Sequence, residues 1–296
     1  MSQQTVLYDA LGPRGRRRVT IGSIVAGLVI AALLVVAGRR FASAGQFQAA
    51  RWKLFTQAPI QRFLLYGLLA TVKVALVAAA LAVVVGIVLA LLRLSRRSAV
   101  RWPTGIYIEF FRGIPLLLLI FFCARGLPQY GLKLSAFWFL VLGLTIYNSA
   151  VFAEIFRAGI LSLPKGQTEA AYAVGLSYPQ AMAFVVVPQA VRRMVPTIVS
   201  QLVTLLKDSS LGFVIPFEEL LRRARGLGEF EPRSILQAYI VVALMYIAVN
   251  VTLSRVAVRL ERRQARRYGG APAVGGTEDL AVMAAETAAA APPARA

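Results

Sequence analysis

Between two long apolar runs lies a polar segment, which reads LPKGQTEAAYAVGLSYPQ over residues 163–180. Residues 168–174 are rich in alanine and favour a short helix. Gly175 suits the left-handed position that follows the last residue of a helix. Ser177 and Gln180 have the spacing of a capping box, and Pro179 would lie in the first turn of a second helix, where its missing N–H costs nothing. The segment therefore predicts a helix, a break and a second helix.

The apolar runs on either side of this segment indicate the fold class. A helix needs about 20 apolar residues to cross a bilayer, and six runs approach or exceed that length. They cover residues 19–37, 63–92, 104–123, 134–156, 191–215 and 235–258. Proline and glycine in the third and fifth runs are tolerable because neighbouring helices can satisfy the freed backbone groups. The sequence predicts an all-α polytopic membrane protein with six transmembrane helices.

The first run follows Arg16, Arg17 and Arg18, so it has two interpretations. A cleaved signal peptide has a shorter apolar core of about 7–15 residues and ends at a small-residue cleavage site. Residues 19–37 form a longer run without a convincing site of that kind. We expect an uncleaved membrane helix, with a cleaved signal peptide as the alternative.

Composition excludes several classes of protein. The chain has 296 residues, 58% of them hydrophobic, and a net charge of +20. A basic nucleic-acid binder would carry its Lys and Arg on one soluble domain, whereas here they lie between the apolar runs. The sequence has no His and a single Cys, Cys123, which excludes His-based catalysis and Cys-cluster metal sites. No Lys follows a Gly, so the phosphate-binding loop of P-loop ATPases is absent.

The basic residues also predict the orientation, because loops on the cytoplasmic side of a membrane are enriched in Lys and Arg. With the N-terminus inside, the cytoplasmic segments hold 18 basic residues and the outer segments hold 11. The chain is therefore expected to be a multi-pass protein with both termini in the cytoplasm.

The polar segment resembles the EAA loop of ATP-binding-cassette (ABC) importer permeases. Glu169-Ala170-Ala171, Gly175, Val185 and Val187-Pro188 keep the spacing of that motif, with Val in place of the usual Ile and Leu. Three further segments resemble the polar amino-acid permeases of the histidine, glutamine and glutamate type: residues 109–116 (EFFRGIPL), 148–160 (NSAVFAEIFRAGI) and 207–211 (KDSSL). The extra N-terminal run and the basic tail are similar to the longer glutamate permeases of actinobacteria.

The resemblance implies a domain organisation. Residues 1–18 would be a basic cytoplasmic N-terminus, 19–37 an extra transmembrane helix and 38–62 an external loop, with an interfacial helix around residues 47–55. Residues 63–258 would form the five-helix core of a type I ABC importer permease, including a cytoplasmic EAA loop at 160–190. Residues 259–296 would be a tail that is basic and then disordered. The location would be the cytoplasmic (inner) membrane of a bacterium.

The resemblance also implies partners. A cytoplasmic ABC ATPase dimer would bind the EAA loop, with Glu169, Ala170, Ala171, Gly175 and Pro188 as its coupling residues. A second permease subunit, identical or similar, and an extracytoplasmic amino-acid-binding protein would complete the importer, surrounded by membrane lipid. The chain would have no catalytic site, metal or cofactor of its own and bind no nucleic acid, since ATP and Mg²⁺ belong to the ATPase.

Ionisable groups at membrane depth are candidate cargo sites because each is costly unless paired or hydrated. One candidate site consists of Lys207, Asp208 and Ser209, followed by Ser210, whose groups would meet the charged ends of an amino acid. Alternatively, the charged residues among them would form a salt bridge between helices. Lys73 would attract an acidic cargo, or else extend to a lipid headgroup. Asn148 would hydrogen-bond either the cargo or a neighbouring backbone.

Two pairs with i, i+3 spacing, Glu109/Arg112 and Glu154/Arg157, each lie on one helix face. They are candidates for ion pairing and gating at the cytoplasmic boundary, or for contact with cargo. The resemblance implies a polar amino acid as the cargo. Lys73, Lys207 and the similarity to the longer glutamate permeases favour glutamate or aspartate. Glutamine, arginine or histidine are alternatives, and an ion-driven secondary transporter is the rival class.

Overall fold

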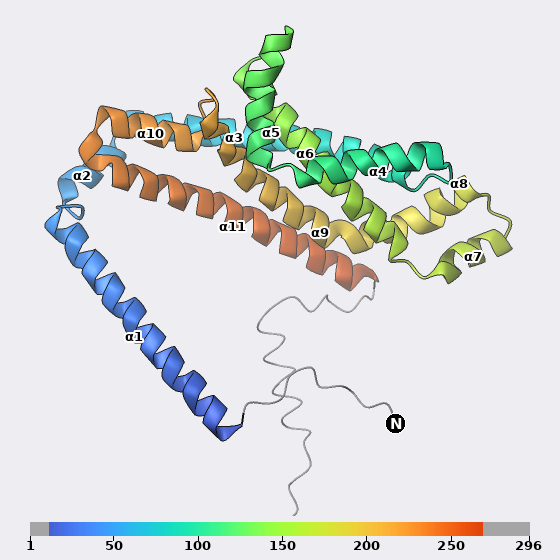
Figure 1. Ribbon diagram of the computed structural model, residues 1–296, viewed down its shortest axis with the longest axis horizontal. Helices are drawn as coiled ribbons and strands as arrows, with labels where there is room; N and C mark the ends of the chain where they lie inside the picture. The colour runs from blue at the N-terminus through green and yellow to red at the C-terminus, as the bar shows by residue number, and fades with distance from the viewer. Residues whose placement is uncertain (1–11, 269–296) are drawn as a thin grey trace, which may run out of the picture. The chain divides into compact units, whose positions relative to one another are not determined.

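The computed structural model describes residues 12–268, and this part of the chain is helical without any strand (Figure 1). The α-helices are α1 (Pro13–Ser43), α2 (Ala49–Lys53), α3 (Ala58–Arg93), α4 (Ser98–Gly113), α5 (Leu116–Phe121), α6 (Ala136–Leu161), α7 (Lys165–Ala173), α8 (Tyr178–Ala181), α9 (Val187–Asp208), α10 (Leu220–Phe230) and α11 (Ile235–Tyr268). Shorter 3-10 or π turns are η1 (Leu54–Thr56), η2 (Phe122–Gly126), η3 (Leu127–Tyr130), η4 (Met182–Val186), η5 (Ser209–Val214) and η6 (Pro232–Ser234). The predicted tail beyond residue 268 lies outside the described residues.

The membrane helices confirm the predicted fold class. Five helical stretches are long and apolar enough to span a bilayer, namely Arg14–Ser43, Ala58–Arg93, Ala136–Leu161, Tyr178–Val214 and Pro232–Val256. A sixth candidate consists of Ser98–Gly113 and Leu116–Tyr130 together, which are bent by 98° at their junction.

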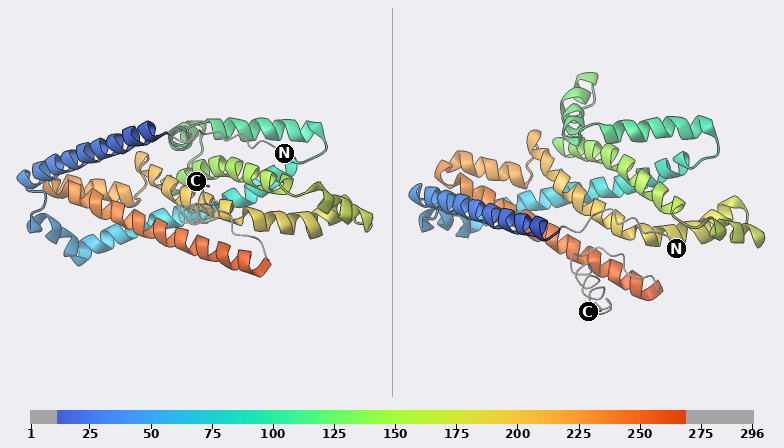
Figure 2. Two further views of the ribbon diagram at one scale, coloured as in Figure 1. Left: turned by 90° about the horizontal axis from the view of Figure 1, so that it is seen from below. Right: turned by 60° about the horizontal axis from the view of Figure 1, so that its bottom comes forward.

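That bend corrects the prediction of one continuous helix over residues 104–123. Helix α4 ends at Gly113, and Ile114 and Pro115 have extended ψ angles of 132° and 125°. A residue before proline is pushed out of the helical region, and proline has no N–H to continue the helix. Figure 2 shows α5 leaving the end of α4 at a steep angle.

The helix that carries the predicted fifth span is longer than the span, which was predicted to start after Pro188. The helical stretch begins at Tyr178 and continues through Pro188. The turn just before it, η4, is π-helical. A proline inside a helix lacks a donor and crowds the carbonyl one turn earlier, and a π turn at this place lets the helix pass the proline without ending.

The described residues form two compact units. The first unit combines residues up to Leu64 with residues 224–241 and contains α1 and α2. Helix α2 lies within residues 47–55, where a short helix was expected, and η1 continues it to Thr56. Within this unit the Gln237 amide nitrogen donates to the backbone oxygen of Gln46 at 2.7 Å.

The second unit, residues 65–223 and from 242 onward, contains the main core. Helix α6 packs against α4, α5 and α9, and α6 and α9 lie side by side in Figures 1 and 2. Leu140, Leu144 and Phe152 of α6 and Leu205 of α9 are fully buried in this core. Membrane helices associate through such close van der Waals packing because lipid removes the hydrophobic drive between them.

Candidate functional site

The polar segment of residues 163–180 folds as a helical hairpin, with α7 and α8 projecting at one end of α9 (Figure 1). Gly175 follows α7 with a φ of +83°. A Cβ added at this position would have no other atom within 4 Å, so the backbone angle and not crowding favours glycine. Its N–H donates to the Tyr172 carbonyl at 2.9 Å, and the Leu176 N–H donates to the Ala171 carbonyl at 3.1 Å. This pair of bonds is the Schellman motif, which confirms the predicted left-handed end of the helix.

The second helix of the hairpin begins with the predicted capping box of Ser177 and Gln180. The Ser177 N–H donates to the Gln180 side-chain oxygen at 2.9 Å. The helix then runs without a break through η4 and Pro188 into α9. A movement of the hairpin would therefore be transmitted directly along this membrane helix.

Two side-chain hydrogen bonds fasten the other parts of the hairpin region to α9. The Gln189 amide nitrogen donates to the Gln167 side-chain oxygen of α7 at 2.9 Å. The Arg193 guanidinium donates to the Ser162 carbonyl, just after α6, at 3.0 Å. Both bonds join residues that are more than 20 positions apart, so the hairpin is held on α9 as one piece.

The two alanines of the EAA motif face different ways. Glu169 and Ala170 are exposed on α7, whereas Ala171 is buried. Beside them Val174 is 77% exposed, and Tyr172, Tyr178 and Phe184 are also exposed. We define the exposed side chains of Glu169, Ala170 and Val174 as the hairpin face. Ala171 instead supports α7 from within its own chain, a role that the sequence did not distinguish from that of Ala170.

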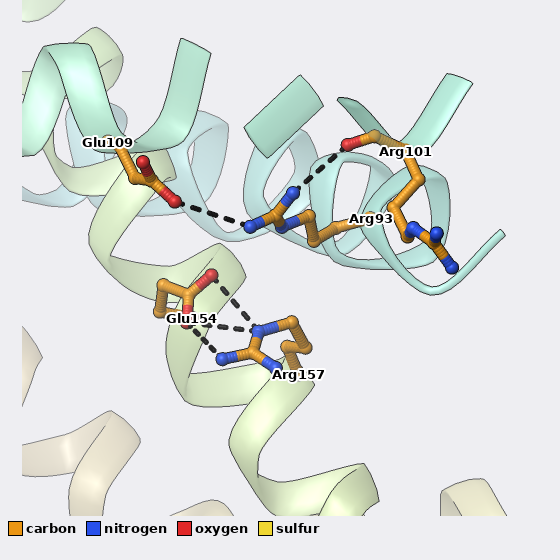
Figure 3. Close-up of polar contacts among 5 residues, drawn as sticks. All are labelled: Arg93, Arg101, Glu109, Glu154 and Arg157. Atoms are coloured by element: carbon orange, nitrogen blue, oxygen red, sulfur yellow. Dashed lines mark hydrogen bonds and ion pairs between the residues drawn. The ribbon is translucent and has the colours of Figure 1, made fainter. Parts of the chain in front are cut away.

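A second polar cluster joins α3 to α4 (Figure 3). One Arg93 nitrogen donates to Glu109 at 3.3 Å and another donates to the Arg101 carbonyl at 3.1 Å. Gly105 makes this possible, because a Cβ at that position would lie 1.8 Å from the Arg93 guanidinium. Glu109 therefore pairs with Arg93 of the preceding helix. The predicted Glu109–Arg112 pair is wrong for the described residues, where Arg112 forms no salt bridge with this carboxylate.

The other predicted pair is confirmed. The Arg157 guanidinium donates to both carboxylate oxygens of Glu154, with distances of 2.8–3.1 Å (Figure 3). The Arg157 side chain is 33% exposed and the Glu154 side chain 21%. Two-pronged bonding of this kind fixes the orientation of both groups as well as adding energy.

Asn148 is a fully buried residue of α6, on the side that contacts α9. Its amide nitrogen donates to the Leu144 carbonyl at 2.9 Å, and its side-chain oxygen accepts a bond of 2.9 Å from Gln201. Asn148 therefore bonds to a neighbouring backbone carbonyl, one of the two predicted alternatives, and also to Gln201, which was not predicted. Gln201 lies 53 positions away, so only the packing of α6 on α9 reveals the pair.

The remaining candidates occupy different environments. The Lys73 ammonium lies 5.5 Å from the centre of the Phe137 ring, a cation–π contact. Lys207 is exposed and Asp208 half-buried, and within residues 12–268 neither forms a salt bridge. The hydroxyls of Ser209 and Ser210 donate to the backbone of their own helix, both at 2.7 Å. The salt bridge between helices that was offered for Lys207 and Asp208 does not form.

Glu219, the fully buried carboxylate just before α10, was not among the residues predicted from the sequence. It accepts hydrogen bonds from the Leu221 N–H at 2.7 Å, from the Arg222 N–H, and from the Tyr246 hydroxyl of α11 at 2.8 Å. Burial raises the pKa of this carboxyl, while these hydrogen bonds act in the opposite direction. No motif or spacing sets Glu219 apart from the exposed Glu218 beside it, so nothing in the sequence pointed to its burial.

Within residues 12–268 no three His, Cys, Asp or Glu side chains converge as a metal site would require. The fold and the hairpin define a helical membrane component with a rigid hairpin that continues into a spanning helix. The chain belongs to the family of binding-protein-dependent transport system inner membrane components, which it matches over residues 82–266.

Named relatives lie within the same family. The chain is 42% identical over 223 residues to the glutamate transport system permease protein GluD of Corynebacterium glutamicum, covering 74% of this chain and 81% of that protein. It is 43% identical over 204 residues to the probable glutamine ABC transporter permease protein GlnP of Bacillus subtilis, covering 68% of this chain and 94% of that protein. These relatives confirm the resemblance to ABC permeases.

A solved structure shares the fold. The structure described as an amino acid ABC transporter with histidines superposes with a TM-score of 0.67 at 32% identity, covering 71% of this chain and 97% of that chain. The match supports the arrangement of helices described above.

Proposed function

We propose that this chain is the membrane subunit of an ATP-driven importer of polar amino acids, with glutamate or aspartate as the cargo. The observation that carries the proposal is the hairpin, which presents Glu169 and Ala170 outward while the Schellman turn at Gly175 holds its shape. A separate ABC ATPase dimer, which binds ATP and Mg²⁺, contacts the hairpin face. The chain itself supplies no bond chemistry.

The path of motion in this proposal follows the contacts of the hairpin. Closure of the ATPase dimer pushes α7, and the Gln167–Gln189 bond and the unbroken helix from α8 to α9 pass the push to the fifth span. Gln201 and Asn148 then couple α9 to α6. The spans rock between inward-open and outward-open states as rigid pieces, a hinge or shear movement.

The charged pairs belong to the same movement. We assign Arg93–Glu109 and Glu154–Arg157, with Arg112, to the inner boundary of the pathway. Arg93–Glu109 would hold α3 and α4 together in one of the two states, while Glu154–Arg157 would keep charged groups of α6 at the boundary. The proposed topology places both pairs on the cytoplasmic side, together with the hairpin. An extracytoplasmic binding protein delivers cargo on the other side, and a second permease subunit completes the pathway.

The choice of an acidic cargo rests on two cations. Lys73 and Lys207 lie within spanning helices, and neither is neutralised by a salt bridge in the described residues. A cation at membrane depth favours a cargo with an additional carboxylate. Asp208 and Ser209 add a carboxylate and a hydroxyl next to Lys207, and Asn148 lies on the neighbouring helix α6. Relatives named for glutamate and for glutamine keep both amino acids among the candidates.

The cargo is tested by uptake of labelled glutamate in cells that express the chain with its ATPase and binding protein. We expect unlabelled aspartate to compete, and glutamine, arginine and histidine to compete poorly. Lys73→Gln and Lys207→Gln should each weaken glutamate uptake about tenfold, the scale of losing a hydrogen bond to a charged group. Lys133→Gln, an equal charge change at an exposed loop residue, is the control. Competition by arginine in preference to aspartate would disprove the acidic cargo.

Coupling to ATP is tested separately with Glu169→Lys. The exposed carboxylate lies on the hairpin face, so we expect a protein that inserts normally but neither transports nor stimulates ATP hydrolysis. Glu229→Lys, the same charge change at an exposed position of α10, should retain both activities. Uptake that persists without any ATPase subunit would instead favour an ion-driven secondary transporter.

A further inference from the structure

A pocket of about 530 Å³ opens between the end of α3 and the start of the helix that carries α8 and α9. Its walls are mainly apolar and include Leu91 and Leu92 from one side and Met182, Ala183 and Val187 from the other. Leu91 and Leu92 are exposed. The volume is in the range of pockets that hold small molecules or parts of larger ones.

The backbone explains why a hollow exists at this place. Met182 and Ala183 belong to η4, the π turn that lets the helix pass Pro188. A π turn widens the helix and displaces its side chains from the regular register, and such turns recur at functional sites. The small side chain of Ala183 leaves the space open.

One guanidinium stands at the edge of the pocket. Arg96 lies with its central carbon 5.0 Å from the centre of the Tyr178 ring, and both residues line the pocket. In the described part of the chain, Arg96 takes part in no hydrogen bond or salt bridge. The ring contact uses only the face of the guanidinium, so its N–H donors stay available to an anion.

The position along the chain gives the depth of the pocket. The span Ala58–Arg93 ends beside it, and the stretch Tyr178–Val214 begins beside it. The pocket therefore lies at the ends of two candidate spans, on the side of the membrane where lipid headgroups would meet them. Arg97 follows in the same short link and Arg101 in the first turn of α4. The proposed orientation places them on the cytoplasmic side, where anionic lipids attract basic residues.

We propose that the pocket binds an anionic phospholipid, with one acyl chain against the apolar walls and the phosphate on Arg96. An apolar pocket with one unpaired cation at its rim matches an amphiphile with an anionic head. Tyr178 and Pro179 of the hairpin line the same pocket, so the lipid would brace the hairpin against α3. The inference depends on the membrane location of the family and not on the identity of the cargo.

The test uses the full-length chain purified in detergent and supplied with equal amounts of phosphatidylglycerol and phosphatidylcholine. Native mass spectrometry counts the lipids that stay bound. We expect phosphatidylglycerol to be retained preferentially and Arg96→Gln to reduce its retention about fivefold, the scale of one basic residue at an anionic membrane surface. Ala183→Phe, which fills the pocket, should reduce retention of the lipid as well.

Arg101→Gln is the matched control, because it removes the same charge from the nearby first turn of α4, at a residue that does not line the pocket. It should retain phosphatidylglycerol as the wild type does. The proposal is overturned by equal losses in Arg96→Gln and Arg101→Gln, or by equal retention of the two lipids. It is also overturned if Ala183→Phe leaves lipid binding intact, or if it changes the oligomeric state, which would make a second copy of the chain the occupant.

Discussion

At the scale of single residues, Gly175 is one of three glycines with a positive φ in the described residues, and it is the one that lies in the hairpin. Its φ of +83° is in the left-handed region, where any side chain costs about 1–2 kcal/mol. We expect Gly175→Ala to loosen the Schellman turn and to lower transport. Hydrogen exchange of residues 165–180 should become faster, and uptake should fall in parallel.

Gly166 supplies the control for that substitution. It lies in α7 of the same hairpin without positive φ, and an added Cβ meets nothing within 4 Å. Alanine is the better helix former by about 1 kcal/mol, so Gly166→Ala should leave transport intact and slow the exchange of α7. Matching losses in the two variants would show that the turn at Gly175 has no special role.

Glu219 is a buried acid whose replacement should lower the free energy of unfolding more than replacement of the exposed Glu218 beside it. Glu219→Ala leaves the N–H groups of Leu221 and Arg222 and the Tyr246 hydroxyl without their acceptor. An unsatisfied buried donor costs about 1–3 kcal/mol. We expect a clearly lower melting temperature in detergent. The neighbouring Glu218→Ala removes only an exposed ion pair with Arg222 and should shift the melting temperature very little; the reverse order would contradict the assignment.

At the scale of elements, the Asn148–Gln201 bond is the polar link between α6 and α9. Hydrogen bonds between membrane helices contribute on average about 0.6 kcal/mol and at most about 1.7 kcal/mol. A double-mutant cycle with Asn148→Ala and Gln201→Ala, measured by unfolding in detergent, should return a coupling energy in that range. Thr204→Ala, whose hydroxyl bonds only to Ser200 of its own helix, should show no coupling to Asn148→Ala.

Elements also show where local sequence patterns stop being sufficient. The hairpin was predictable because each of its signals acts over a few residues: alanines favour α7, Gly175 ends it, and Ser177 with Gln180 starts α8. The break between α4 and α5 was not predicted, although Pro115 causes it. Inside a membrane a proline is compatible with a continuous helix, as Pro188 demonstrates, and the local sequence does not separate the two outcomes.

At the scale of the whole molecule, the proposed orientation places the hairpin in the cytoplasm and the turn η3 outside. Single cysteines can test this once Cys123 is replaced by alanine. Tyr130→Cys, at a position that is 84% exposed, and Val174→Cys, at one that is 77% exposed, supply the two sites. An impermeant maleimide added to intact cells should label the first, and the second only after permeabilisation. Labelling of Val174→Cys in intact cells would place the hairpin outside and end the coupling proposal.

Sequence alone determined the class of the fold, the number of candidate spans and the shape of the hairpin, because apolar length, helix propensity and capping are properties of short segments. The tertiary structure decided the partners of the polar groups: Arg93 rather than Arg112 for Glu109, Gln201 for Asn148, and Tyr246 for Glu219. Such pairs depend on which helices pack together and on the space that residues such as Gly105 leave open. That information is distributed over the whole chain, so no local pattern contains it.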